Sequence, residues 1–146
     1  MNNKDYTTEF LVDQQPEEVF AAINNVHGWW SGLLEGATDR VDEEFTYRYK
    51  DMHYSRQRIT QLEPFKKIAW RVTDSNLYFL KNGENAWTGT EILFTISRQD
   101  HKTKVHFTHI GLQPGIECYE ACSNGWNHYI HNSLFPLITT GNGQPD

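Results

Sequence analysis

Apolar and polar residues alternate through most of this chain, the pattern of β-strands that bury one face. Residues 6–12 form the first such segment. A helix is predicted over residues 16–24, because Pro16 suits the first helical position and apolar or small side chains recur at the three- and four-residue intervals of a helix. The glycines of HGWWSG (residues 27–32) then limit that segment to a short helical turn.

The middle of the chain indicates a series of antiparallel strands. Five further segments alternate in the same way: 43–50, 53–62, 66–72, 87–97 and 103–112. A run of such one-sided strands is typical of an antiparallel sheet with one face covered. Aromatic side chains dominate the face predicted to be covered: Phe45, Tyr47, Tyr49, Trp70, Phe94 and Phe107.

The cover for this face is predicted in the last part of the chain. Between residues 115 and 138, apolar or small residues recur every three or four positions, as on one side of a helix. They are Ile116, Tyr119, Ser123, Trp126, Ile130, Leu134 and Leu137. Pro136 should kink or fray the last turn. The predicted fold class is therefore α+β, with a curved antiparallel sheet packed against one long C-terminal helix.

Composition indicates that large rings carry much of the core. Aromatic residues make up 14% of the 146 residues, whereas only 38% are hydrophobic. The length is that of one ordinary domain. We expect residues 1–146 to form a single domain with a disordered tail over residues 141–146.

Charge and hydropathy exclude several classes of partner. The net charge of −6 argues against nucleic acid, because phosphate binding needs a concentrated basic face. No apolar run approaches the ~18 residues of a membrane helix, and the N-terminus lacks the apolar core of a signal peptide. We therefore expect a cytoplasmic protein with no membrane span and no nucleic-acid partner.

Two adjacent tryptophans, Trp29 and Trp30, lie in the short turn. Neighbouring side chains point about 100° apart on a helix and to opposite faces on a strand. The two rings therefore cannot enter a core in the same way. We expect Trp29 to anchor the turn and Trp30 to edge a pocket.

The pairing of the first predicted hairpin leaves two arrangements open. A two-residue turn at residues 51–52 would place Arg56 opposite Tyr47 and turn Arg56 and Arg58 toward the aromatic face, where they would suit an anionic ligand. Ile59 has the opposite parity, and a bulge would turn both arginines outward. We favour an exposed pair at the rim of the sheet.

The titratable side chains give no recognisable catalytic or metal-binding set. Cys118 and Cys122 are four residues apart on the predicted helix, a geometry that suits a disulfide poorly, and we expect two buried, reduced thiols. By parity His109 points inward, where it could hold a polar ligand group or act as a base. We favour a core histidine satisfied by a neighbour. No metal and no cofactor is expected.

Five segments resemble one superfamily: FLVDQQPEEVFAAI, the WW pair, WTGTEILFTI, THIGL and NGWNHYIHNSLFPLI. In their order they resemble START-like (SRPBCC) proteins, and in particular the branch similar to the C-terminal domain of the activator of heat-shock protein 90 ATPase. The resemblance implies a helix-grip fold, in which a curved sheet wraps around a long C-terminal helix and two short helices follow the first strand. It also implies a cavity between sheet and helix, often used for apolar small molecules.

For function, the resemblance implies binding of a small hydrophobic or amphipathic molecule, such as a lipid or a polyketide-like aromatic compound. The expected ligand-binding residues are Trp30, Tyr47, Tyr49, Trp70, Phe94, His109 and Trp126. A cyclase- or hydrolase-like enzyme using the same cavity is the alternative, with His109 or a tyrosine as general acid or base. A contact with the chaperone is less favoured, because its activators carry a further N-terminal domain for which this length leaves no room.

Overall fold

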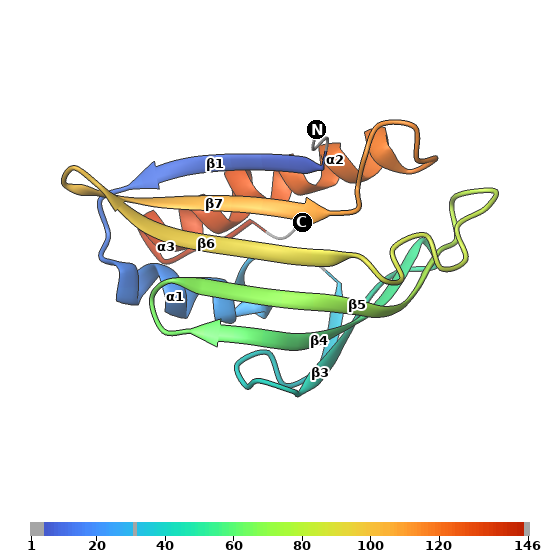
Figure 1. Cartoon of the computed structure of the whole chain (residues 1–146), viewed down its shortest axis with the longest axis horizontal. Coiled ribbons are helices and arrows are strands. Elements are labelled where there is room, and N and C mark those ends of the chain that lie inside the picture. The colour runs from blue at the N-terminus through green and yellow to red at the C-terminus, as the bar shows by residue number, and fades with distance from the viewer. Residues whose placement is uncertain (1–4, 31, 145–146) are drawn as a thin grey trace.

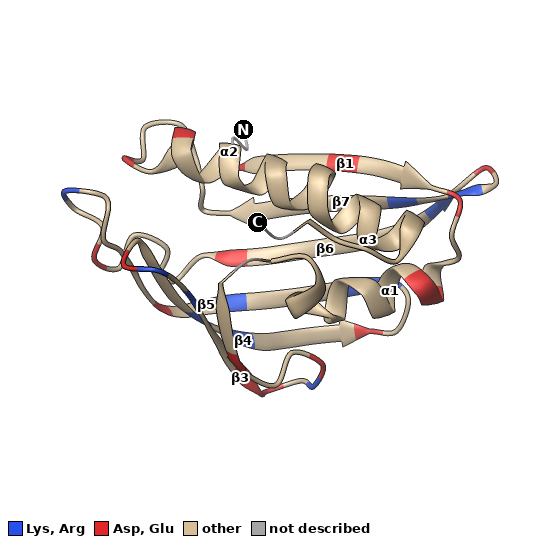
Figure 2. Ribbon diagram, turned by 180° about the vertical axis from the view of Figure 1, so that it is seen from behind, with Lys and Arg blue, Asp and Glu red and all other residues tan. Residues whose placement is uncertain are grey.

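The computed structural model describes residues 5–30 and 32–144. Over these residues, seven strands form one antiparallel sheet in the order β1-β7-β6-β5-β4-β3-β2. The strands are β1 (Tyr6–Val12), β2 (Leu33–Gly36), β3 (Glu44–Tyr49), β4 (His53–Glu63), β5 (Lys67–Leu77), β6 (Glu91–Gln99) and β7 (Lys102–Ile110). The helices α1 (Pro16–Asn24), α2 (Tyr119–Tyr129) and α3 (Phe135–Thr140) lie on one face of the sheet (Figures 1 and 2). The predicted α+β arrangement is confirmed.

The first two elements have the bounds predicted from the sequence. α1 begins at Pro16, and two acidic side chains in its first turn interact favourably with the helix dipole. The helix buries Val19 and Ile23. A single 3₁₀ turn, Val26–Gly28, follows as expected. The short edge strand β2 was not predicted, because its four residues are too few to show alternation.

The register of the β3–β4 hairpin differs by one residue from that of a two-residue turn. Tyr47 pairs with Ser55, not with Arg56. The turn contains three residues, of which Lys50 adopts a φ of 50°. Arg56 and Arg58 consequently point away from the covered face and are exposed.

The C-terminal helix begins at Tyr119 and not near residue 115 as predicted. A π-helical turn, Ile130–Leu134, separates α2 from α3 just before Pro136, which has no N–H to donate to the preceding turn. The wider turn adds a residue and shifts the buried side of the helix, so Ile138 is buried and Leu137 only partly so. None of the described helices is long and apolar enough to cross a membrane.

Trp29 connects the end of α1 to the C-terminal helix. Its indole N–H donates to the carbonyl of Ile23 at 3.0 Å, and its own carbonyl accepts from the Ser133 hydroxyl at 2.7 Å. The backbone N–H of Gln144 donates to the same hydroxyl at 3.0 Å. Part of the predicted tail therefore lies against this turn, while residues 145–146 are outside the described residues.

A buried hydrogen-bond chain connects α2 to the sheet. The Trp126 indole N–H donates to His109 Nδ1 at 3.0 Å. Because Nδ1 accepts, the proton of the neutral ring is on Nε2, which donates to Thr90 Oγ1 at 2.8 Å. Thr90 Oγ1 donates in turn to the carbonyl of Trp87 at 2.6 Å. His109 is thus a core histidine with both ring nitrogens satisfied.

Protonation of His109 should make folding depend on pH. Burial lowers the pKa of His109 to about 3, whereas an unfolded histidine has a pKa of about 6.5. The unfolded chain therefore binds the extra proton first, and stability is lost as pH falls from about 6.5 toward 3. His109→Gln should remove this part of the pH dependence, at most about 1.4 kcal/mol per pH unit.

Urea denaturation of wild type and His109→Gln at pH 7, 6 and 5 would measure this difference. His101→Gln, in the exposed β6–β7 turn, is the matched control for loss of a histidine. Parallel pH dependences of wild type and His109→Gln would contradict the expectation.

Candidate functional site

A partly open cavity of about 330 Å³ lies between the sheet and α2. Its wall comes from the turn after α1, the β3–β4 hairpin, the β5–β6 loop and α2. The lining residues are Trp30, Tyr47, Tyr49, Met52, His53, Phe79, Trp87, Ala121, Cys122, Gly125, Trp126 and Tyr129. Among the described residues of this wall there is no lysine, arginine, aspartate or glutamate. The volume is at the small end of known small-molecule pockets.

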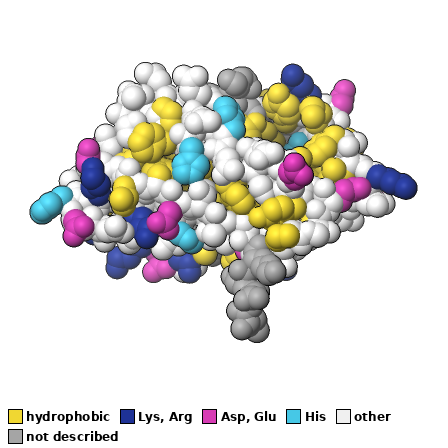
Figure 3. Space-filling view, turned by 90° about the horizontal axis from the view of Figure 1, so that it is seen from above, with side chains coloured by type: hydrophobic (Ala, Val, Ile, Leu, Met, Phe, Trp, Pro, Cys, Tyr) yellow, Lys and Arg dark blue, Asp and Glu magenta, His cyan; other side chains and the backbone are white. Residues whose placement is uncertain are grey.

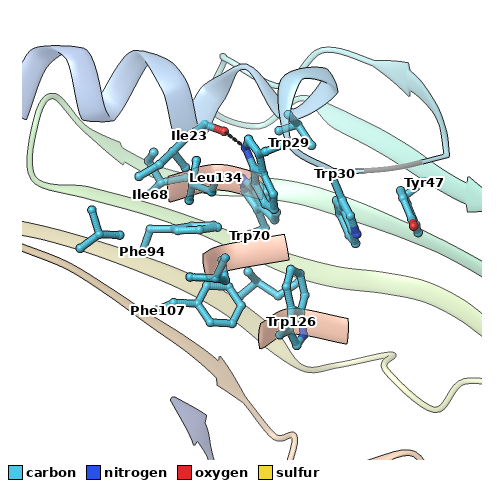
Figure 4. Close-up of a cluster of buried hydrophobic side chains, with 14 of the residues drawn as sticks. Ile23, Trp29, Trp30, Tyr47, Ile68, Trp70, Phe94, Phe107, Trp126 and Leu134 are labelled. Atoms are coloured by element: carbon cyan, nitrogen blue, oxygen red, sulfur yellow. Dashed lines mark hydrogen bonds between the residues drawn. The ribbon is translucent and has the colours of Figure 1, made fainter. Parts of the chain in front are cut away.

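Five rings form a closed circuit in this wall: Trp30, Tyr47, His53, Trp87 and Trp126. Successive ring centroids are 3.9, 4.9, 4.6, 5.7 and 5.3 Å apart. Trp30 stacks on Tyr47 at an interplanar angle of 9°, and Figure 4 shows these two rings side by side. His53 meets Tyr47 and Trp87 edge-on, so each ring restrains the orientation of its neighbours.

The two adjacent tryptophans occupy different places. Trp30 lines the cavity, whereas Trp29 is fully buried behind it. The Trp29 ring lies nearly parallel to that of Trp70 at 6.4 Å. In Figure 4, Trp29 and Tyr47 lie on opposite sides of Trp30. Trp29 therefore serves as the anchor of the turn, and its neighbour contributes a face of the wall.

The structure brings together four of the seven residues expected at the site. These are Trp30, Tyr47, Tyr49 and Trp126. Trp70, Phe94 and His109 are fully buried and do not line the cavity. Trp70 packs against Trp30, and His109 packs against Trp87 and Trp126. Strand parity identified the covered face correctly but could not tell which of its rings fill the core.

Two residues of the ring circuit were missed from the sequence. Trp87 was predicted to open the alternating segment 87–97, with the opposite parity to the buried Ile92 and Phe94, but β6 begins only at Glu91 and Trp87 lies in the β5–β6 loop. His53 opens β4 and shares its parity with Ile59, which is fully buried. That parity was the signal that could have placed His53 on the covered face.

Gly125 leaves space in the wall contributed by α2. A glycine inside a helix costs about 1 kcal/mol relative to alanine. A Cβ at this position would meet no atom within 4 Å, so close packing does not require a glycine. A side chain here would project into open space beside the other lining residues.

His53 is held by a short polar chain on β4. The Gln57 amide donates to Ser55 Oγ at 2.6 Å, and Ser55 Oγ lies 3.0 Å from His53 Nε2. Burial lowers the pKa of His53 to about 3, and nearby His109 acts in the same direction. His53 is therefore neutral near pH 7, and the described residues of the wall carry no formal charge.

Cys122 lines the cavity, and Cys118 is buried next to it. Both thiols are free. Hydrogen bonding to Cys118, together with burial, raises the pKa of Cys122, so it presents a neutral thiol to the cavity. Among the described residues, no three histidine, cysteine, aspartate or glutamate side chains converge on a metal position.

Charged side chains lie mostly around the periphery of the molecule. Figure 3 shows lysine and arginine side chains spread along the edges of one face with acidic ones beside them, and hydrophobic side chains between. The coloured side chains of this face form no concentrated basic surface of the kind that phosphate binding needs.

Solved structures share this architecture. The Aha1 dimer from Colwellia psychrerythraea is 21% identical, with a TM-score of 0.76 over 95% of this chain and 98% of that one. DynU16, from the dynemicin biosynthetic locus, is 15% identical, with a TM-score of 0.71 over 97% of this chain and 49% of that one. CalU16 from Micromonospora echinospora is 13% identical, with a TM-score of 0.64 over 92% and 74%. At these identities the similarity shows the fold alone.

A search of curated protein sequences found no match to this chain. A family model described as Activator of Hsp90 ATPase homolog 1-like protein matches residues 13–136. The matched segment runs from the start of α1 to the beginning of α3 and includes every residue that lines the cavity. The chain therefore belongs to the activator of Hsp90 ATPase homolog 1-like family, within the START-like superfamily.

Proposed function

We propose that this protein binds a small apolar or aromatic molecule in the cavity between the sheet and α2. Gly125 carries the proposal. Glycine lowers the stability of the helix by about 1 kcal/mol relative to alanine, at a position where the surrounding atoms leave room for a methyl group. The space left by the missing side chain is part of the cavity. This favours the explanation that glycine keeps the cavity open over the explanation that close packing requires it.

The walls favour a small, neutral ligand. A volume of about 330 Å³ holds on the order of ten water-sized groups, which is closer to one or two fused rings than to a whole lipid. The aromatic side chains of Trp30 and Trp126 in the wall offer apolar contact. Because none of the described side chains in the wall is charged, an ionised group would lose its hydration without gaining a partner there.

The same geometry gives less support to acid–base catalysis. A general base works best with a pKa near the operating pH. Burial lowers the pKa of both His53 and His109 to about 3. Both nitrogens of His109 are also engaged within the core. Binding without chemistry is therefore the better-supported function.

Gly125→Ala should stabilise the protein. The new methyl group meets no atom and removes the helix penalty of glycine, so the free energy of unfolding should rise by about 0.5–1 kcal/mol. Urea denaturation followed by circular dichroism would measure it. A loss of stability would show that packing requires the glycine and would remove the observation on which the proposal rests.

Gly125→Leu should block binding by filling the cavity. Isothermal titration calorimetry with neutral one- and two-ring aromatics, namely indole, naphthalene and quinoline, should show binding to wild type and at least tenfold weaker binding to the variant. Asn124→Leu is the matched control, because it adds the same side chain at an exposed neighbouring position of α2. The proposal fails if wild type binds none of the three compounds or if Gly125→Leu binds them as well as wild type.

A further inference from the structure

His53 lines the cavity and has one ring nitrogen held by the protein. Nε2 lies 3.0 Å from Ser55 Oγ. Nδ1 has no hydrogen-bond partner among the described residues. It is also not fully buried, unlike the unpaired polar atoms of the core. Because His53 lines the cavity, Nδ1 is available to whatever occupies it.

The direction of the Ser55–His53 hydrogen bond follows from Gln57. Its amide N–H donates to Ser55 Oγ at 2.6 Å, and both side chains are fully buried. A hydroxyl that accepts this bond still has its own proton to donate. Among the described residues, His53 Nε2 is the acceptor within reach of that proton. Ser55 therefore donates to Nε2, and the neutral ring carries its proton on Nδ1.

We infer that His53 determines the specificity of the cavity, with its Nδ1–H selecting neutral aromatic molecules that carry a hydrogen-bond acceptor at the ring edge. The acceptor can be a ring nitrogen or a carbonyl oxygen, since both offer a lone pair in the plane of the ring. This inference rests on the proposed function, because it names the ligand class of the same cavity.

The surroundings of His53 make this hydrogen bond selective. The rings of Trp87 and Tyr47 meet the imidazole edge-on at 4.6 and 4.9 Å, which restrains its orientation. A ligand without an acceptor would cover the N–H and leave it unpaired, and such a loss costs roughly tenfold in affinity. An anionic acceptor would find no cationic partner among the side chains that the structure describes in this wall.

The two buried histidines are thereby held in opposite tautomers. At His109, Nδ1 accepts from the Trp126 indole, so Nε2 carries the proton. At His53, Nε2 accepts from Ser55, so Nδ1 carries it. The first tautomer serves the core, and the second directs a donor toward the cavity.

Naphthalene and quinoline test the inference, because they have the same shape and differ by one ring nitrogen. At pH 7.5 quinoline is neutral, and calorimetry on wild type should give it a roughly tenfold lower Kd than naphthalene. In His53→Phe the ring remains but the donor is lost, so naphthalene should still bind and the preference for quinoline should disappear. Equal affinities in wild type would overturn the inference while leaving cavity binding intact, whereas binding of neither compound, and of indole no better, would overturn the proposed function itself.

A second measurement needs no ligand. Long-range ¹H–¹⁵N correlation spectra of the ¹⁵N-labelled protein distinguish the two histidine tautomers, and His53→Phe assigns the His53 signals by their loss. Wild type should show the Nδ1–H pattern for His53 and the Nε2–H pattern for His109. Ser55→Ala removes the donor to Nε2 and should shift His53 toward the other tautomer. An Nε2–H pattern for His53 in wild type would overturn the inference.

Discussion

The hydrogen bond from Trp126 to His109 fixes α2 over the sheet, and the cavity depends on it. A buried indole N–H needs a partner, and the imidazole of His109 supplies one from near the end of β7. Thr90 extends the connection to the backbone of Trp87, so the two stacked rings of Trp126 and Trp87 are positioned by one chain. The residue beside Trp126 is Gly125. The same turn of helix is therefore held against the sheet and leaves space next to it.

Local signals predicted much of the fold. Alternation, Pro16 and the acidic first turn act over a few residues, so the bounds of β1 and α1 could be predicted from the sequence. The β3–β4 register could not, because it depends on whether the turn has two or three residues, and a slip of one residue reverses every side chain. The only constraint on that choice was the buried parity of Ile59. The effect of Pro136 was predicted as a disturbance, but whether the helix kinks or widens depends on its packing.

The site was predicted less well, because a cavity is a property of packing between distant segments. Tyr47 and Trp70 share the covered face, yet one lines the cavity and the other fills the core. What separates them is the position of Trp30, which stacks directly on the tyrosine and also packs against the other tryptophan. Trp87 enters the wall from the β5–β6 loop, although alternation predicted a strand from residue 87 onward. Residue type and parity therefore identify candidates, and only the contacts between elements distinguish wall from core.

His53 and His109 differ in their hydrogen-bond partners and not in their pKa values, and the partners decide which of the two can bind a ligand. Burial lowers the pKa of both to about 3, so both are neutral over the same pH range. His109 was predicted as a ligand-binding residue because its position in the strand directs it inward. In the structure, both of its nitrogens form hydrogen bonds within the core. His53 lines the cavity with one nitrogen beside Ser55 Oγ, and its other nitrogen has no hydrogen-bond partner among the described residues. A neutral histidine with one unpaired ring nitrogen can carry a free N–H donor. The free-energy cost of leaving that donor unpaired is recovered only when a ligand accepts its hydrogen bond.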